Sequence, residues 1–385
     1  MPVPGAALPD WPEDLLPPPF AGDSGSDAPQ SPGLLGLLAS LVRDPQPGRD
    51  LVVVLDGVGA DLLAEHRGLT PVLRRLAGST SRIRTVAPTT TATAMVSLLT
   101  GEPPLAHGVL GYTTRDPDRD EPLNQIQGGP AVVPEEWMPV PTLLEEHPRR
   151  AIQVGPAKHA GSHLSRVAFR GWEFRGHGRH DAVDTSLAAL RAAGPEGLVH
   201  LHVDQVDHTG HRHGVDSDAW RTALADADSL LGALLRRAPT GTRVHVTADH
   251  GMVDTSPQHL VDLADHPRLQ SLASVVAGEA RALALTAVDA PGAVAQLRSG
   301  LQELLGERAL VLTRDQVLRI GMLGPIGASV PERVSGRVPD VLVLARGRWS
   351  VDDYSRRPAR TRAMIGVHGS LTSAEAWVPL VRVDA

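Results

Sequence analysis

The chain has 385 residues, 42% of them hydrophobic and 21% charged, which is enough for a large buried core and typical of globular proteins. Its formal net charge of −7 argues against a nucleic-acid polymer as partner, because such binders present basic surfaces. The absence of cysteine excludes disulfides, thiolate metal ligands and a cysteine nucleophile. The sequence shows neither a secretory leader nor an apolar run of about 18 residues, so we expect a cytoplasmic protein without membrane association.

Residues 1–31 are rich in Pro, Gly, Ala, Ser and Asp, and this composition predicts an irregular, partly mobile lead-in. From residue 32 onward, apolar runs that end in Asp, Thr, Pro or Gly alternate with helical stretches. These runs are LVVVLDGVG (51–59), RIRTVAP (82–88), LVHLHVD (198–204), RVHVTAD (243–249) and VLVLARG (341–347). Continuous apolar runs are typical of buried parallel strands, so we predict an α/β fold with a central, mostly parallel sheet between helix layers.

Two segments depart from this alternation. Residues 113–180 are rich in Gly, Pro, His and Trp, and we expect them to form a loop-rich wall of a pocket. Residues 279–320 read strand, helix, strand, helix, and predict a small inserted α+β lobe. In open α/β sheets, binding sites form just beyond the carboxyl ends of the strands, so these segments would flank such a site.

Acidic and histidine side chains gather at the predicted strand ends. Taken singly, each has an ordinary explanation, since an Asp after a strand often caps a helix or forms a turn. The set as a whole comprises Asp56, Asp207, His211, Asp249, His250 and, in a weaker motif, His368. Six oxygen and nitrogen ligands suit two zinc ions with three protein ligands each, leaving an open position on both. Two ions about 3.5–4 Å apart can clamp the attacking and leaving oxygens of a phosphoryl transfer.

Thr91 is the predicted nucleophile, in the stretch APTTTATAMVSLLTG (87–101). Its hydroxyl is weak at neutral pH, but metal coordination can lower its pKa. It also begins a predicted helix, whose free N–H groups and dipole favour a bound phosphate. The neighbours Thr89, Thr90 and Thr93 compete for this role, and the spacing to SLLTG favours Thr91.

The phrases PTTTATAMVSLLTGEPPLAHGVLGY, VDHTGHRHG, ADHGM and HGS resemble, in this order, the alkaline phosphatase superfamily, and most closely its nucleotide pyrophosphatase/phosphodiesterase branch. The resemblance runs from Leu51 to His368 and implies one catalytic domain over residues 32–385, with two divalent ions, zinc first and manganese second. It implies one ion on Asp56, Asp249, His250 and the nucleophile Thr91, and another on Asp207, His211 and His368. The implied mechanism passes through a phosphothreonine that water then hydrolyses.

One position departs from the family pattern. The diesterase branch carries an asparagine after the nucleophile helix that donates to a phosphoryl oxygen, and here Tyr112 stands in that place. A tyrosine hydroxyl also donates, but it reaches further and fills more volume. Further candidate substrate contacts in this region are Asn124, Trp137, Lys158 and His159.

The resemblance implies metal-dependent hydrolysis of a phosphodiester or nucleotide pyrophosphate bond in a small anionic ester. A phosphomonoesterase, a phosphonate hydrolase or a manganese-preferring phosphomutase on the same site are the alternatives. A sulfatase is disfavoured, because the C/S-x-P-x-R signature is missing around Thr91. A non-catalytic member of the fold is disfavoured because all six ligands are present, and the oligomeric state stays open.

Overall fold

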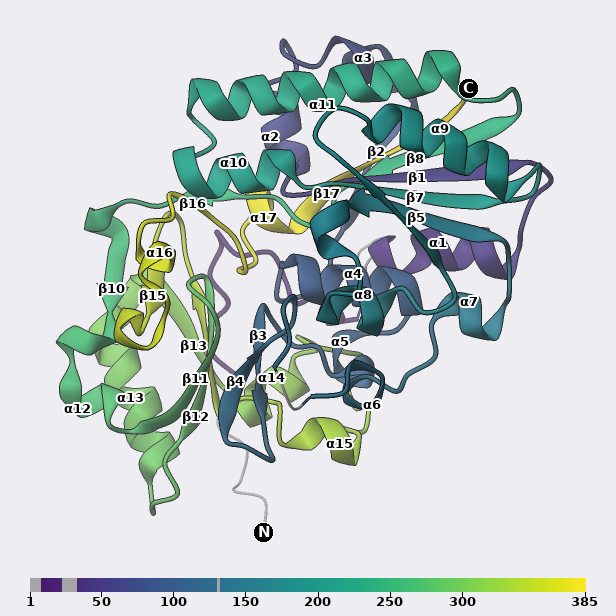
Figure 1. Ribbon diagram of the computed structural model, residues 1–385. Helices are drawn as coiled ribbons and strands as arrows, with labels where there is room; N and C mark the ends of the chain where they lie inside the picture. Colours follow the sequence, from purple (N-terminus) through teal and green to yellow (C-terminus); the bar gives the residue numbers. More distant parts are fainter. Residues whose placement is uncertain (1–7, 23–32, 130–131) are drawn as a thin grey trace.

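The computed structural model describes residues 8–22, 33–129 and 132–385, so parts of the predicted lead-in, 1–7 and 23–31, lie outside the described residues. A seven-stranded sheet with the order β2-β17-β8-β1-β7-β5-β6 forms the centre (Figure 1). Neighbouring strands from β8 to β6 run parallel, whereas β17 is antiparallel to both β8 and β2. These strands are β1 (Arg49–Leu55), β2 (Thr80–Arg84), β5 (Ala151–Pro156), β6 (Glu173–His177), β7 (Leu198–Val203), β8 (Thr242–Thr247) and β17 (Trp377–Asp384).

Strand β1 shows why the sheet lies between two helix layers. Its alternate side chains Leu51, Val53 and Leu55 belong to one buried cluster, whereas Val52 and Val54 belong to another. Helices α9 and α11 contribute to the first cluster, and α1 and α4 to the second (Figure 1). The main helices are α1 (Gly33–Arg43), α4 (Thr91–Thr100), α9 (Ala182–Ala193), α10 (Gln205–His213) and α11 (Asp218–Arg237). The predicted α/β architecture is therefore confirmed.

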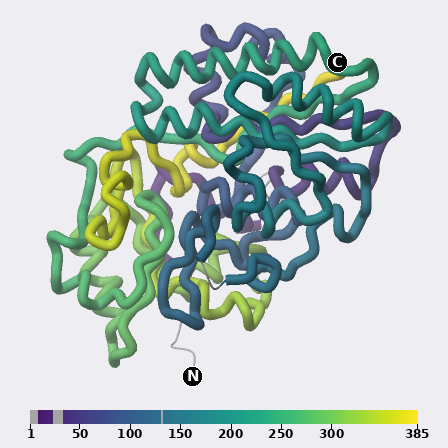
Figure 2. Tube along the Cα trace, viewed as in Figure 1, coloured from purple at the N-terminus to yellow at the C-terminus, as the bar shows by residue number. Residues whose placement is uncertain are grey.

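A second sheet, with the order β11-β12-β14-β13, forms an antiparallel lobe beside the main sheet (Figure 2). Its elements are β11 (Ala273–Glu279), β12 (Ala282–Ala287), α13 (Ala293–Leu305), β13 (Ala309–Thr313), α14 (Arg314–Arg319) and β14 (Val341–Ala345). The predicted range 279–320 holds β12, α13, β13 and α14, while β11 and β14 extend the lobe on both sides. The interpretation of 341–347 as a parallel strand of the central sheet was wrong, because β14 pairs antiparallel with β12 and β13. An apolar run indicates that both faces of a strand are buried, but it does not indicate which strand lies beside it.

Shorter elements connect these layers. The remaining strands are β3 (Thr113–Asp116), β4 (Glu121–Asn124), β9 (Val253–Asp254), β10 (Leu260–Asp262), β15 (Ser350–Asp352) and β16 (Gly366–Val367). Further helices are α2 (Ala60–Glu65), α3 (Pro71–Arg75), α5 (Pro104–His107), α6 (Pro134–Trp137), α7 (Leu143–Glu146), α8 (His163–Ala168), α12 (Pro267–Gln270), α15 (Glu332–Ser335), α16 (Ala359–Arg362) and α17 (Ser373–Ala376). The range 113–180 contains loops and short helices, but it also supplies β5 and β6 to the main sheet.

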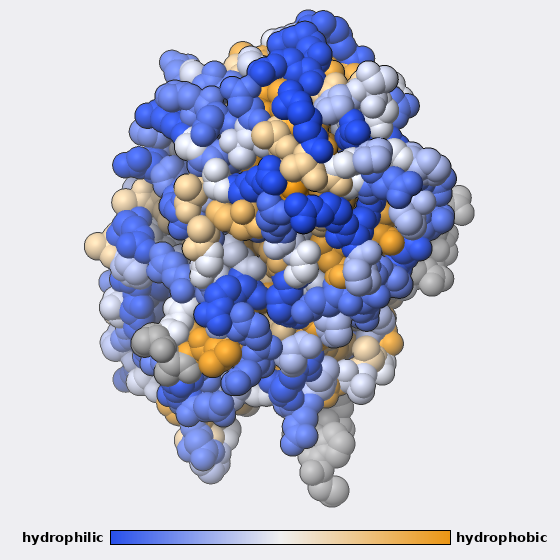
Figure 3. Space-filling view, turned by 45° about the vertical axis from the view of Figure 1, so that its right-hand side comes forward, coloured by the Kyte–Doolittle hydropathy of each residue, from blue (hydrophilic) through white to orange (hydrophobic). Residues whose placement is uncertain are grey.

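The described part of the N-terminal segment, residues 8–22, has neither helix nor strand, yet it packs against the fold. Leu15 and Phe20 are buried at 2% and 3% exposure. The Leu16 N–H donates to the Leu371 carbonyl, so the segment touches the loop that follows His368. Figure 3 shows a mainly hydrophilic face with scattered apolar patches, and within the described ranges no helix is long and apolar enough to cross a membrane.

Asp50, near the start of β1, lies at the amino ends of the parallel strands, at the opposite end of the sheet from the carboxyl ends where Asp56 and Asp249 follow. It is fully buried and accepts hydrogen bonds from His245, Arg243 and Arg149 at 2.9–3.0 Å. Burial alone would raise the pKa of Asp50, but these bonds outweigh it and lower the pKa from 3.8 to about 2.

We expect Asp50→Asn to lower the free energy of unfolding by about 2 kcal/mol at pH 6. Since the folded pKa lies below the unfolded one, the ionised Asp50 stabilises the fold above pH 3.8. This stabilisation is lost as the pH falls toward 2. Denaturant unfolding of both proteins between pH 6 and pH 3 measures the difference, which should shrink at the acidic end. A difference that stays constant with pH would contradict this account.

Candidate active site

The candidate site lies where three neighbouring parallel strands end. Asp56 follows β1, Asp207 lies in α10 just after β7, and Asp249 follows β8. Because Leu55 pairs with Val203 and Val54 with Thr247, the three strand ends lie side by side at one sheet edge. This parallel register brings together carboxylates that are far apart in sequence.

The six predicted metal ligands meet at this edge. Ligand atoms of Asp207, His211 and His368 lie within 4.8 Å of one another, as do those of Asp56, Asp207 and His250. Asp249 adjoins the second group, with its Oδ2 3.6 Å from His250 Nε2. Asp207 lies between both groups, whereas the resemblance assigned it to one ion only.

Unpartnered carboxylate oxygens show that the site suits cations. Asp249 Oδ1 accepts from the N–H groups of Gly57 and His250, while its Oδ2 is buried and has no hydrogen-bond partner among the described residues. Asp207 Oδ1 is likewise buried and unpartnered in this part of the chain. A buried acceptor without a partner is costly, and a divalent cation would satisfy both oxygens.

The three histidines share one orientation. Nδ1 of His211, His250 and His368 lies 2.8–3.0 Å from the carbonyl oxygens of Gly366, Gly251 and Thr89, respectively. An N–H at Nδ1 can donate to each carbonyl, which leaves each Nε2 facing the carboxylates, where it can bind a metal ion in place of a proton. Such backbone bonds fix the tautomer and the ring orientation of metal-binding histidines.

The site concentrates negative charge. Burial raises the pKa of Asp56 to about 7, the carboxylates of Asp249 and Asp207 add to this, and His202 opposes it. Burial alone would lower the pKa of His211, but Asp207 outweighs it and raises the pKa to about 9. Burial and the neighbouring His250 lower the pKa of His368. This crowding of carboxylates is a physical reason for cations to bind.

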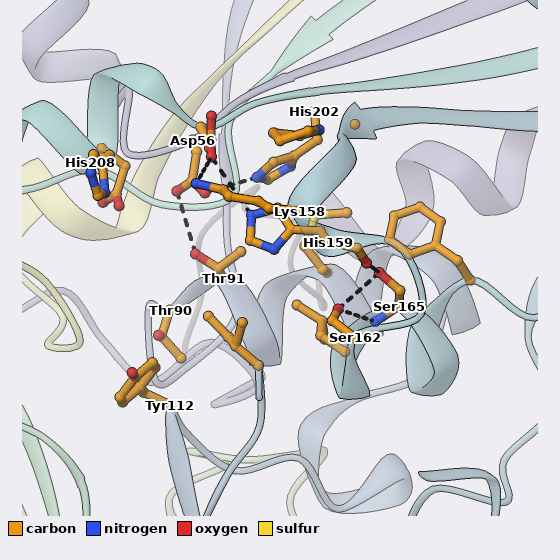
Figure 4. A pocket seen from close by; sticks show the side chains of 18 of the residues that line it. Asp56, Thr90, Thr91, Tyr112, Lys158, His159, Ser162, Ser165, His202 and His208 are labelled. Atoms are coloured by element: carbon orange, nitrogen blue, oxygen red, sulfur yellow. Dashed lines mark hydrogen bonds and ion pairs between the residues drawn. The ribbon is translucent and has the colours of Figure 1, made fainter. Parts of the chain in front are cut away.

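Thr91 is the first residue of α4 and faces the carboxylates (Figure 4). Its Oγ1 lies 3.4 Å from Asp56 Oδ1 and 3.2 Å from His250 Nε2. Of its neighbours, Thr89 donates its hydroxyl to the Ser370 carbonyl and Thr93 is fully buried. Thr91 is thus the threonine whose hydroxyl oxygen contacts two members of the second ligand group, Asp56 and His250.

A cavity of about 220 Å³ opens beside Thr91, and its lining includes Tyr112, Lys158 and His159. In Figure 4 the Lys158 and His159 side chains extend toward Asp56 and Thr91. Asp204, which also lines the cavity, lies 3.0 Å from Lys158 Nζ and 3.7 Å from His159 Nε2. Tyr112, Lys158 and His159, predicted from the sequence as candidate substrate contacts, therefore line one cavity with Thr91.

Asn124 and Trp137 stand outside this lining. The Asn124 side chain accepts from the N–H groups of residues 126 and 127, which is a turn role. Trp137 is buried and donates its indole N–H to Gln125. The structure therefore gives both side chains hydrogen-bond partners within the protein and places neither of them in the lining of this cavity.

Sequence reasoning missed His202 and Asp204. His202 Nε2 lies 2.9 Å from Asp56 Oδ2, whereas Thr91 contacts the other carboxylate oxygen, Oδ1. Burial alone would lower the pKa of His202, but Asp56 outweighs it and raises the pKa to about 9. The signal was present, because a histidine interrupts the apolar run of β7 and an Asp directly follows that strand.

Fold and site together define an α/β protein of the alkaline phosphatase type, with a candidate two-cation centre at the edge of its main sheet. The family model for type I phosphodiesterase/nucleotide pyrophosphatase matches residues 51–371, so the chain belongs to that family of hydrolases, as the sequence resemblance predicted. A search of curated proteins gave no match.

Solved structures support the fold. Murine ectonucleotide pyrophosphatase/phosphodiesterase 5, in an inactive form in complex with AMP, is 17% identical with a TM-score of 0.65, over 87% of each chain. Phosphonoacetate hydrolase from Sinorhizobium meliloti 1021, in complex with phosphonoformate, is 16% identical with a TM-score of 0.62. That match covers 87% of this chain and 89% of the hydrolase.

We expect metal-free Asp56→Asn to melt no lower than the metal-free parent, because the substitution removes one of the crowded negative charges. Added zinc should raise the melting temperature of the parent strongly and of the variant much less, since a ligand is lost. Thermal melts with and without chelator measure both effects. An equal zinc-induced rise in the two proteins would contradict the assignment of Asp56 as a ligand.

Proposed function

We propose that the chain is a zinc-dependent hydrolase of phosphodiester or nucleotide pyrophosphate bonds, with Thr91 as nucleophile. The observation that carries this proposal is the position of Thr91 Oγ1, at the start of α4 and within 3.4 Å of both Asp56 and His250. Family membership supports the reaction class.

The six ligands fit two divalent ions. The supporting observations are the buried carboxylate oxygens that have no hydrogen-bond partner among the described residues, and the Nε2 atoms that face the carboxylates. Asp56, Asp249 and His250 would hold one ion and Asp207, His211 and His368 the other. Bound there, such ions supply charge that lowers the pKa of a coordinated hydroxyl and neutralises phosphoryl oxygens.

The chain's own groups then account for the two steps. Thr91 Oγ attacks phosphorus in line, the bond from phosphorus to the leaving oxygen breaks, and the proton of the Thr91 hydroxyl ends on the leaving group. The N–H groups at the start of α4 face the phosphoryl oxygens, because they have no partner within the helix. Water then attacks phosphorus and frees the Thr91 hydroxyl, releasing the phosphate product.

A phosphonate hydrolase is the second candidate. Tyr112 replaces the family asparagine, and Lys158 with His159 offers cationic or polar groups at the cavity wall. The similar solved structure of phosphonoacetate hydrolase gives this alternative a precedent on the same fold.

Thr91→Ala should reduce kcat by at least about 1,000-fold, because the variant has no oxygen to attack phosphorus. Thr93→Ala is the matched control, since Thr93 lies two residues further along the same helix and is buried away from the cavity. Zinc-loaded protein and bis-p-nitrophenyl phosphate provide the assay. Retained turnover in Thr91→Ala, above the level with chelator, would exclude Thr91 as the nucleophile.

The ratio of diesterase to monoesterase activity tests the role of Tyr112. We expect the parent to hydrolyse bis-p-nitrophenyl phosphate faster than p-nitrophenyl phosphate. Tyr112→Phe should lower kcat about 10-fold if its hydroxyl donates to the phosphoryl group, the magnitude of one lost donor of moderate strength. If the parent hydrolyses p-nitrophenyl phosphate faster, the diesterase proposal is wrong and a phosphomonoesterase takes its place.

A further inference from the structure

A buried ion pair joins the lobe to the loop that carries His368. Arg281, in the turn between β11 and β12, donates through Nε and Nη2 to the two carboxylate oxygens of Glu375 at 3.0 and 2.7 Å. Both side chains are fully buried. Glu375 lies in α17, which leads into β17 of the main sheet. The pair therefore crosses the seam between the lobe and the catalytic sheet.

Glu375 also holds the loop after His368. Its Oε1 accepts from the Ser370 N–H at 2.9 Å, and its Oε2 accepts from the Thr372 hydroxyl. Its backbone carbonyl accepts from the Gly251 N–H at 2.8 Å, one residue after His250. One residue thus contacts the segments that present two of the candidate metal-binding histidines.

Thr89 continues this network to the nucleophile helix. Its Oγ1 accepts from the Gly369 N–H and donates to the Ser370 carbonyl, and its own carbonyl accepts from His368 Nδ1. Its N–H donates to the Gly369 carbonyl at 3.1 Å. Because Thr89 lies two residues before Thr91, a displacement of the 368–372 loop would shift both His368 and the start of α4.

Close packing reinforces the contact with the lobe. At Gly369 an added Cβ would lie 2.8 Å from Glu279 Cγ and 3.3 Å from Arg281 Cβ, so the hairpin turn packs directly on this backbone. Arg281 Nη1 also donates to the carbonyls of Gly347 and Trp349, which ties it to the lobe. The guanidinium thus contacts both the lobe and Glu375, which holds the loop after His368.

We propose that Arg281 and Glu375 are positioning residues, through which the lobe fixes His368 and the beginning of the nucleophile helix. This inference rests on the proposed metal centre, since His368 is placed as one of its ligands. Outer partners of metal ligands typically change metal affinity or activity by about 10- to 100-fold when removed.

A paired replacement separates this role from stability. Loss of one partner alone leaves a buried unpaired charge and can unfold the protein, whereas replacing both by apolar residues of similar volume is often neutral. The test variant is Arg281→Met/Glu375→Leu. The matched control is Arg357→Met/Asp352→Leu, another buried ion pair, which joins β15 to the segment after it with N–O distances of 2.9 and 3.0 Å. Thr89→Val is a further variant of nearly the same shape, which removes only the hydroxyl contacts with the loop.

Zinc titration of each metal-free protein by calorimetry is the readout, with melting temperature as the check on folding. We expect two ions per chain in the parent and in the control pair. In the Arg281/Glu375 variant one of the two zinc affinities should fall at least about 10-fold. Its kcat should fall while its KM changes less. Thr89→Val should also lower one zinc affinity. Arg281→Lys, which keeps the positive charge but not the two-nitrogen contact with Glu375, should show a smaller loss than the double variant.

Unchanged zinc affinities in a folded Arg281/Glu375 variant would overturn the inference, and so would an equal loss in the control pair. If the test variant does not fold, Thr89→Val decides, and unchanged zinc affinity there would also overturn it. A parent that binds two ions but hydrolyses no ester would contradict the proposed function. The zinc affinities of the parent, the Arg281/Glu375 variant and the control pair would still test the positioning role in that case.

Discussion

Crowding of three carboxylates at one buried sheet edge is the constraint on which the rest of the site depends. Asp56 and Asp249 are 5% and 1% exposed, and Asp207 adjoins both ligand groups. Like charges at this distance destabilise the folded chain unless protons or cations compensate them. The remaining features of the site serve either to tolerate this charge or to use it.

The fold meets the constraint through rigid, closely packed loops. Gly57 has a φ of +73°, and an added Cβ there would lie 3.0 Å from Asp207 Cβ. At Gly251 an added Cβ would lie 1.9 Å from the Ala374 carbonyl, so only glycine lets this loop approach α17. These contacts hold the strand-end loops so close together that the carboxylates after separate strands face one another. The same closeness places Thr91 within reach of Asp56 and His250.

Much of this arrangement could be predicted, because its signals are local. Apolar runs that end in Asp mark parallel strands, and the structure brings the three Asp residues after β1, β7 and β8 to one edge, together with His211, His250 and His368. The missed features depend on long-range contacts. The apolar pattern of strand β5 is interrupted by Gln153 and Gly155, and β14 pairs in the lobe although its pattern matches a central strand. The contacts of His202 and Arg281 likewise join segments with no shared sequence pattern.

Anomalous diffraction from crystals grown with zinc tests the central claim most directly, because it places the ions without reference to activity. The account predicts two peaks beside Thr91, one among Asp56, Asp249 and His250. The other should lie among Asp207, His211 and His368. A single peak, or peaks only at surface histidines, would contradict a two-cation centre held by these carboxylates.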